Sequence, residues 1–196
     1  MSSTIAPIHR VLALPGSLRR ASYNRLLLDA AAAHAPRSMR IEVYEALREV
    51  PLFDEDLEAT DPDGPEGVRR LRDAIAAADG LLIATPEYNQ SLPGVLKNAI
   101  DWLSRDTPRQ ASPLNGKPVA IVGVTAGRWG TRYAQAALRH TLTATGAVVM
   151  PSPMLFVNDA ASRLDAERRS YDAGTMESMQ RLLEAFDDWI GWRRRD

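Results

Sequence analysis

Four polar side chains gather where the first apolar run of the chain stops. The stretch LALPGSLRRASYN covers residues 12–24, and after Pro15-Gly16 it supplies Ser17, Arg19, Ser22 and Asn24. A helix that begins near Ser22 presents unpaired backbone N–H groups and the positive end of its dipole to this loop. With the added side-chain donors, the loop has the chemistry of a phosphate-binding site. The alternative is structural, with Ser22 as a helix cap and Arg19 as a solvated side chain.

A second loop combines a ring, a proline and an amide. It opens the stretch PEYNQSLPGVLKNAIDW, residues 86–102, and its candidate ligand-binding residues are Pro86, Glu87, Tyr88 and Asn89. A flat heteroaromatic ring with polar edges suits this mixture of stacking surface and hydrogen-bonding groups. The alternative is a turn with a half-buried tyrosine. Glu87 caps a helix or pairs with a basic residue in that case, and we assign it no proton-transfer role.

A third loop, TAGRWG at residues 125–130, follows an apolar run and contains two glycines. Its candidate residues Thr125, Ala126 and Gly127 are placed to cover the other side of the same ring. The chain lacks the signatures of other nucleotide and hydrolase sites, since G-x-x-x-x-G-K-[ST], G-x-G-x-x-G and G-x-S-x-G are all absent. With no cysteine and three scattered histidines, we expect neither thiolate catalysis nor a metal site, and we assign no catalytic residue.

Short apolar runs alternate with helical patterns along the chain. The predicted strands are 10–14, 40–44, 80–85, 118–124 and 147–151. The predicted helices are 22–35, 66–78, 93–104, 130–145 and 174–192, each with apolar residues three and four positions apart. Met176, Met179, Leu183, Phe186 and Ile190 follow this spacing in the last helix, which we interpret as a core element. Strict β-α alternation predicts a three-layer α/β fold with a parallel sheet and helices on both faces.

The topology predicts where the three loops lie. Ligands of open parallel sheets bind beyond the carboxyl ends of the strands, near the point where strand order reverses, and all three loops follow strands at that edge. The longest irregular stretch, residues 48–67, is rich in Asp, Glu and Pro and is either a lid or a surface connection.

Composition restricts the class of protein. A length of 196 residues with 45% hydrophobic and 25% charged residues suits a single domain over 1–196 with a buried core. The net charge of −1 gives no global attraction to nucleic acid or to an acidic membrane. We find no signal-peptide pattern and no apolar stretch long enough to span a membrane, so we expect a cytoplasmic protein.

The three loops together resemble the NADPH-dependent FMN reductase family of flavodoxin-like proteins, which includes quinone, chromate and azo-dye reductases. The motifs GSLRRASYN, PEYNQSLPGVLKNAIDW and VGVTAGRWGTRYAQAALRHTL carry the resemblance, over about residues 9–155. It implies a five-stranded sheet of order 2-1-3-4-5 and a non-covalent FMN. Ser17, Arg19, Ser22 and Asn24 would hold the phosphate; Pro86, Glu87, Tyr88 and Asn89 would line the ring and ribityl chain; Thr125, Ala126 and Gly127 would close the far side.

The chain departs from the family pattern in the third motif. Thr131 follows Trp129-Gly130 where family members often have paired glycines, so we expect Thr131 to narrow or reshape the pocket. Ala126 also differs from some members. The family commonly forms dimers or tetramers with the flavin near a subunit boundary, which makes 93–104 a candidate interface of a homodimer or homotetramer.

The implied reaction is ping-pong hydride transfer from NADPH or NADH through FMN to a small acceptor such as a quinone, a flavin, an azo compound or chromate. Arg20, Arg128 and Arg132 are the candidates for contacting a nucleotide 2′-phosphate. Two other interpretations of the function stay open. A flavodoxin-type electron carrier would be expected to be strongly acidic, which a charge of −1 does not favour. A sensor or scaffold would have kept the fold and lost the cofactor.

Overall fold

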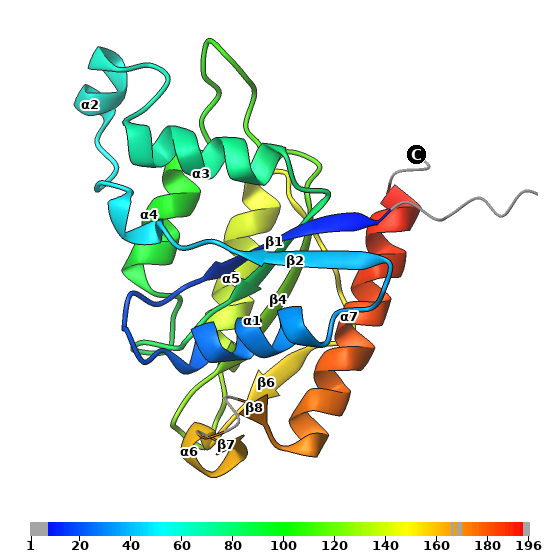
Figure 1. Ribbon diagram of the computed structural model, residues 1–196. Coiled ribbons are helices and arrows are strands. Elements are labelled where there is room, and N and C mark those ends of the chain that lie inside the picture. The colour runs from blue at the N-terminus through cyan, green and yellow to red at the C-terminus, as the bar shows by residue number, and fades with distance from the viewer. Residues whose placement is uncertain (1–7, 166, 168–169, 194–196) are drawn as a thin grey trace, which may run out of the picture.

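A parallel sheet runs through the middle of the molecule, and helices cover both of its faces (Figure 1). The structure is a computed structural model that describes residues 8–165, 167 and 170–193. The strand order is β2-β1-β3-β4-β5, which confirms the order expected from the resemblance. The strands along this path are β1 (His9–Pro15), β2 (Met39–Val43), β3 (Gly80–Ala84), β4 (Pro118–Val124) and β5 (Val148–Val149).

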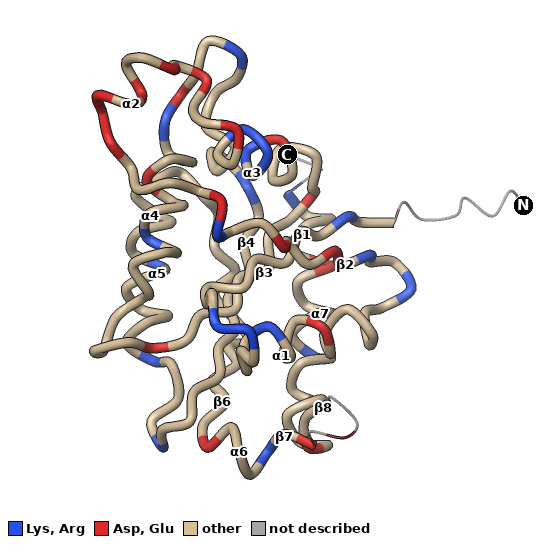
Figure 2. The backbone as a smooth tube through the Cα atoms, turned by 60° about the vertical axis from the view of Figure 1, so that its left-hand side comes forward, with Lys and Arg blue, Asp and Glu red and all other residues tan. Residues whose placement is uncertain are grey.

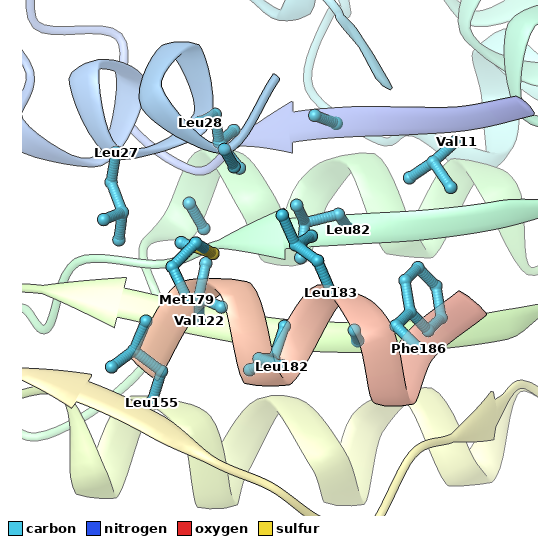
Figure 3. Close-up of a cluster of buried hydrophobic side chains, with 14 of the residues drawn as sticks. Val11, Leu27, Leu28, Leu82, Val122, Leu155, Met179, Leu182, Leu183 and Phe186 are labelled. Atoms are coloured by element: carbon cyan, nitrogen blue, oxygen red, sulfur yellow. The ribbon is translucent and has the colours of Figure 1, made fainter. Parts of the chain in front are cut away.

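Alternating side chains of the central strands enter two separate cores. In β1, Val11 and Ala13 face one side of the sheet and Leu12 and Leu14 face the other. The first side is covered by α1 (Tyr23–Ala33) and α7 (Ala173–Arg193), and Figure 3 shows this core. The second is covered by α3 (Glu66–Ala76), α4 (Gly94–Leu103) and α5 (Arg132–Ala144). This two-residue period with both faces covered is why the strands are almost continuously apolar.

The last helix is a core element, as its spacing predicts. Met179, Leu183, Phe186 and Ile190 of α7 are fully buried. Gly80 lies directly against Phe186 and Ile190, and a Cβ atom there would stand 2.6 Å from Ile190 Cδ1. Because no real Cβ atom approaches that closely, α7 packs onto the sheet only where the strand carries no side chain.

The edge of the sheet beside β4 differs from the prediction of a single fifth strand. Only Val148 and Val149 of the expected strand 147–151 form β5 against the first part of β4. A separate strand, β6 (Leu155–Val157), pairs in parallel with the second part of β4, from Val122 to Val124. The interruption is explained by Pro151 and Pro153, because proline cannot donate a ladder hydrogen bond. The split brings residues 155–160 to the carboxyl edge of the sheet.

The stretch 48–67 is less irregular than expected. It contains part of the short 3-10 helix η1 (Leu47–Glu49), all of α2 (Glu55–Thr60) and the start of α3. Asn98 of α4 accepts a hydrogen bond from the Phe53 amide (2.7 Å) and donates to the Pro51 carbonyl (2.8 Å). These contacts favour the surface connection over the lid.

The chain between β6 and α7 forms small elements that the sequence pattern does not reveal. They are α6 (Ala160–Arg163) and a two-stranded antiparallel pair, β7 (Leu164–Asp165) and β8 (Ser170–Tyr171). No helix within the described ranges is long and apolar enough to cross a membrane. Residues 1–7, where a leader peptide would begin, lie outside the described residues.

Candidate functional site

The three loops meet at the carboxyl edge of the sheet, beside the point where strand order reverses between β1 and β3. They enclose a cavity of about 160 Å³. Of the eleven candidate residues, all but Asn89 and Gly127 line it, and Tyr23 and Val124 line it in addition: Ser17, Arg19, Ser22, Asn24, Pro86, Glu87, Tyr88, Thr125 and Ala126. The parallel topology therefore brings together segments that are about a hundred residues apart.

The first loop offers unpaired donors at the start of α1. The backbone amides of Tyr23 and Asn24 have no hydrogen-bond acceptor among the described residues, as expected for the first turn of a helix. The exposed guanidinium of Arg19 lies 5.3 Å from the centre of the Tyr23 ring and has no carboxylate partner in the described part of the chain. Free amides beside a free guanidinium are suited to an anion such as a phosphate.

Two candidate residues of this loop also have structural roles. Ser22 is the N-cap of α1, and its hydroxyl accepts a hydrogen bond from the Arg25 amide at 3.3 Å. Asn24 is buried, and its amide group donates to the Val124 carbonyl (2.9 Å) and accepts from the Val124 amide (3.0 Å). Asn24 thus uses its side chain to join the first loop to the end of β4. Its contribution to a bound anion would come from its backbone amide.

Glu87 joins the second loop to the third. Its carboxylate accepts hydrogen bonds from the backbone amides of Tyr133 (2.9 Å) and Ala134 (3.0 Å), in the first turn of α5. Thr131, the N-cap residue, makes no such bond with its own side chain. A negative charge at this end of a helix is also favoured by the helix dipole. Of the two structural alternatives for Glu87, the helix cap is the one found.

The second loop projects a tight turn into solvent. The Tyr88 amide donates to the Ser91 carbonyl (3.1 Å) and the Ser91 amide donates to the Tyr88 carbonyl (3.0 Å). Between them, Asn89 and Gln90 have φ angles of 50° and 60°, as a type I′ turn requires. Two consecutive non-glycine residues in the left-handed region cost roughly 1–2 kcal/mol each. The strained turn leaves Tyr88 half exposed, with its hydroxyl 3.4 Å from Ser17 Oγ.

The third loop is held by the segment that follows β6. The Thr125 amide donates to the Val157 carbonyl (3.0 Å), the Ala160 amide to the Thr125 carbonyl (3.1 Å) and the Asp159 amide to the Gly127 carbonyl (3.2 Å). A Cβ atom on Gly127 would meet no protein atom within 4 Å. The loop is therefore fixed on the side of residues 157–160 and open to solvent at Gly127, which leaves room for a ligand.

The expectation for Thr131 is wrong. Its side chain is buried, accepts a hydrogen bond from Gln135 Nε2 at 3.0 Å and does not line the cavity. It packs instead against Gly123, where a Cβ atom would approach Thr131 Oγ1 to 2.2 Å. Thr131 supports the loop from the core and leaves the shape of the pocket to the residues above it.

Sequence reasoning missed the support from the C-terminal part of the chain. The buried Tyr171 of β8 donates its hydroxyl to the Tyr23 carbonyl at 2.8 Å and so fixes the start of α1. Burial raises the pKa of this hydroxyl, which keeps it a hydrogen-bond donor. Nothing in the spacing around Tyr171 or around Val157 indicates these contacts, because they depend on the small elements after β6.

The shape and chemistry of the site fit FMN. The cavity of about 160 Å³ is smaller than the roughly 300–1,000 Å³ of pockets that enclose a whole ligand, so it suits the phosphate and part of the ribityl chain. The phosphate would meet the free amides of α1 and Arg19. The ring would lie over the edge between the exposed turn at 88–91 and the open loop at 125–128. No cluster of metal-ligating side chains lies in the described residues.

A parallel sheet of this order, with loops gathered at its carboxyl edge, places the protein in the flavodoxin-like class. A flavodoxin from the domain Archaea has the same fold, with a TM-score of 0.61 at 11% identity over 93% of this chain and 99% of that chain. A closer structural match is FerB, a flavoenzyme NAD(P)H:(acceptor) oxidoreductase from Paracoccus denitrificans. It has a TM-score of 0.84 and 35% identity, covering 95% of this chain and 99% of that one.

Sequence comparison then defines the family. Residues 9–162 match the NADPH-dependent FMN reductase family. An NAD(P)H-dependent FMN reductase of Pseudomonas aeruginosa is 44% identical over 92% of this chain and 95% of its own length. A 2-hydroxy-1,4-benzoquinone reductase of a Burkholderia species is 39% identical, covering 94% and 98%. The chain belongs to the NADPH-dependent FMN reductase family and is an oxidoreductase of the flavodoxin-like fold.

Asn24→Ala tests the buried connection between the loops. The change leaves the Val124 amide and carbonyl without partners, and each costs about 1–3 kcal/mol when buried. We expect the free energy of unfolding, measured in urea, to fall by roughly 2–5 kcal/mol, and FMN affinity to fall in the protein that remains folded.

Asn98→Ala is the matched control, because Asn98 makes the same pair of bonds to Phe53 and Pro51 outside the three loops; its oligomeric state is compared with that of the starting protein, since Asn98 lies on α4. Its stability loss should be smaller, since Trp102 Nε1 still donates to the Pro51 carbonyl at 3.0 Å. FMN affinity should be unchanged. Equal losses of FMN affinity in both variants would show that Asn24 has no particular role in placing the loops.

Proposed function

We propose that this chain uses non-covalently bound FMN to pass a hydride from NADPH or NADH to a small acceptor of the quinone class. The observation that carries the proposal is the corner at the start of α1. There the free amides of Tyr23 and Asn24 and the unpaired Arg19 face a cavity shared with the other two loops. A phosphate is the ligand that satisfies all of these donors at once.

The protein's own part in the reaction is binding and orientation. FMN held in this cavity would supply the hydride-transfer chemistry between the nucleotide and the acceptor. Ser17, Arg19 and the first amides of α1 would hold the phosphate and so fix where the ring lies. Tyr88 and the loop at 125–127 would flank the ring, and backbone N–H groups beside it would favour the negative charge that develops on reduction.

Several features support a planar acceptor. Tyr88 is 50% exposed, and the space above Gly127 is free of protein atoms, so a ring has access from solvent on that side. Several relatives are named as quinone reductases, among them that of Burkholderia and one of Escherichia coli at 38% identity over 92% of this chain.

An electron carrier without pyridine-nucleotide activity is not favoured. The net charge of −1 gives little electrostatic basis for docking a redox protein, and the relatives at 44% and 39% identity are named as reductases. A scaffold that has lost the cofactor would not need to keep an unpaired arginine beside free helix amides.

Anaerobic addition of NADPH or NADH to the FMN-loaded protein tests the proposal. We expect the visible flavin absorbance to bleach rapidly and to return when a benzoquinone is added in stoichiometric amount. Bleaching that is no faster than with free FMN would contradict the enzyme assignment and favour the electron carrier. A protein that stays colourless after reconstitution would favour the scaffold.

Arg19→Ala tests the phosphate assignment. Loss of a charge-assisted hydrogen bond costs about 1.5–3 kcal/mol, so FMN affinity should fall roughly ten- to hundredfold in a titration of the apo-protein. Arg37→Ala is the control, because Arg37 is exposed in the turn between α1 and β2, at the opposite edge of the sheet. An Arg19→Ala protein with the same affinity as the Arg37→Ala protein would refute the assignment.

Two further parts of the proposal concern the assembly and the compartment. We propose a homodimer or homotetramer with α4 at the interface, and support comes from Leu52, which is 82% exposed next to the residues that Asn98 binds. We also propose the cytoplasm as the compartment, which suits an enzyme that uses NADPH or NADH.

A further inference from the structure

A second, larger cavity lies on the other side of the first loop. Its volume is about 430 Å³, and it is enclosed by residues 15–20 and by the segment 44–48 that follows β2. Ser17 and Arg19 line both this cavity and the flavin cavity. A molecule bound here would therefore adjoin the phosphate end of the proposed flavin site at Ser17 and Arg19.

The cavity is strongly basic. Four arginines line it (Arg19, Arg20, Arg25 and Arg48) against one carboxylate, Glu45. Figure 2 shows basic residues, in blue, gathered at the start of α1. Such a concentration of positive charge is unusual in a chain whose 24 basic and 25 acidic residues nearly cancel.

One of these arginines is neutralised and three are not. Arg25 donates to Asp29 at 2.9 Å and to both oxygens of Glu45. Its hydrogen bonds to Glu45 hold the pKa of that carboxyl below its usual range. Arg48 donates to the Leu18 carbonyl at 2.7 Å, a neutral partner. Within the described residues, no carboxylate pairs with Arg19, Arg20 or Arg48. Uncompensated guanidiniums around one cavity are an arrangement that a phosphate dianion would stabilise.

Apolar and aromatic residues also contribute to the lining of the cavity. Leu18, Tyr44 and Leu47 line it, and all three belong to or pack against the core on the α3 and α4 side of the sheet. A lining that combines apolar side chains with arginines suits a flat base that carries a phosphate. A free inorganic anion would make no favourable contact with these apolar side chains.

The other two arginines that the sequence offers for a 2′-phosphate lie elsewhere. The Arg128 guanidinium is 4.6 Å from the centre of the Trp129 ring, and that of Arg132 is 4.7 Å from the centre of the Phe156 ring. Neither lines the second cavity. Of the three candidates, it is Arg20 that lines this cavity together with Arg19 and Arg48.

We propose that the second cavity binds the adenosine 2′-phosphate end of NADPH, with Arg20 and Arg48 as the residues that distinguish NADPH from NADH. This inference rests on the proposed function, since it assigns the adenosine end of a nucleotide whose nicotinamide reaches the flavin ring. It adds a preference for NADPH and names the residues responsible for it. Arg19, which borders both cavities, would lie between the flavin phosphate and the nucleotide.

Steady-state kinetics of the FMN-loaded Arg20→Gln and Arg20→Gln/Arg48→Gln proteins test the proposal, with Arg37→Gln as the control for loss of an exposed positive charge. We expect the KM for NADPH to rise roughly ten- to hundredfold in the double variant and less in the single variant. The KM for NADH should change less than about twofold. Equal changes for the two nucleotides, or none for NADPH, would overturn the proposal.

Inhibition by fragments identifies the ligand chemistry. In the starting protein, 2′,5′-ADP should compete with NADPH at much lower concentration than 5′-AMP or inorganic phosphate, and the double variant should lose that advantage. Inhibition by inorganic phosphate as strong as by 2′,5′-ADP would overturn the nucleotide assignment in favour of a general anion site.

An FMN titration of the same proteins separates this inference from the proposed function. FMN should bind the Arg20→Gln and Arg37→Gln proteins as tightly as the starting protein, because neither residue lines the flavin cavity. Failure of FMN to bind the starting protein would contradict the proposed function itself. Normal FMN binding without discrimination between nucleotides would contradict only the inference about the second cavity.

Discussion

The candidate site depends on holding three loops in a fixed relation, although each extends from a different strand. Backbone hydrogen bonds fix the third loop to the segment after β6, and side chains add the links between one loop and the next. Asn24 binds both the amide and the carbonyl of Val124, and Glu87 accepts from two amides of α5. The first contact is buried, where an unmade hydrogen bond is costly, so the loops are held in one arrangement.

The polar residues of the three loops are numerous because they have two different roles. Asn24 and Glu87 satisfy backbone groups of the protein, whereas Ser17 and Arg19 remain available at the surface of the cavity. The segment after β6 and the hydroxyl of Tyr171 fix the third loop and the start of α1 from behind. The site is thus supported on the protein side and open on the ligand side, which is the arrangement that orients a cofactor without enclosing it.

The sequence predicts the fold because its apolar runs and helical spacings repeat with the periods of strands and helices. The loops that form the site follow from the same rule, since parallel strands bring their carboxyl ends to one edge. The rule that brings the loops together does not predict which way each side chain of a loop points. Asn24 and Thr131 point into tertiary contacts with Val124 and Gly123 that no local pattern indicates. The split of the fifth strand, and with it the support from residues 157–160, depends on how the chain re-pairs after two prolines.

The central claim is that a phosphate group is bound where β1 passes into α1. The most direct test compares the affinities of the apo-protein for FMN and for riboflavin, which have the same ring and ribityl chain and differ only in the phosphate. At about 1.5–3 kcal/mol for each charge-assisted hydrogen bond, two such bonds predict that FMN binds roughly 10²–10⁴ times more tightly. Equal affinities for the two flavins would contradict the account.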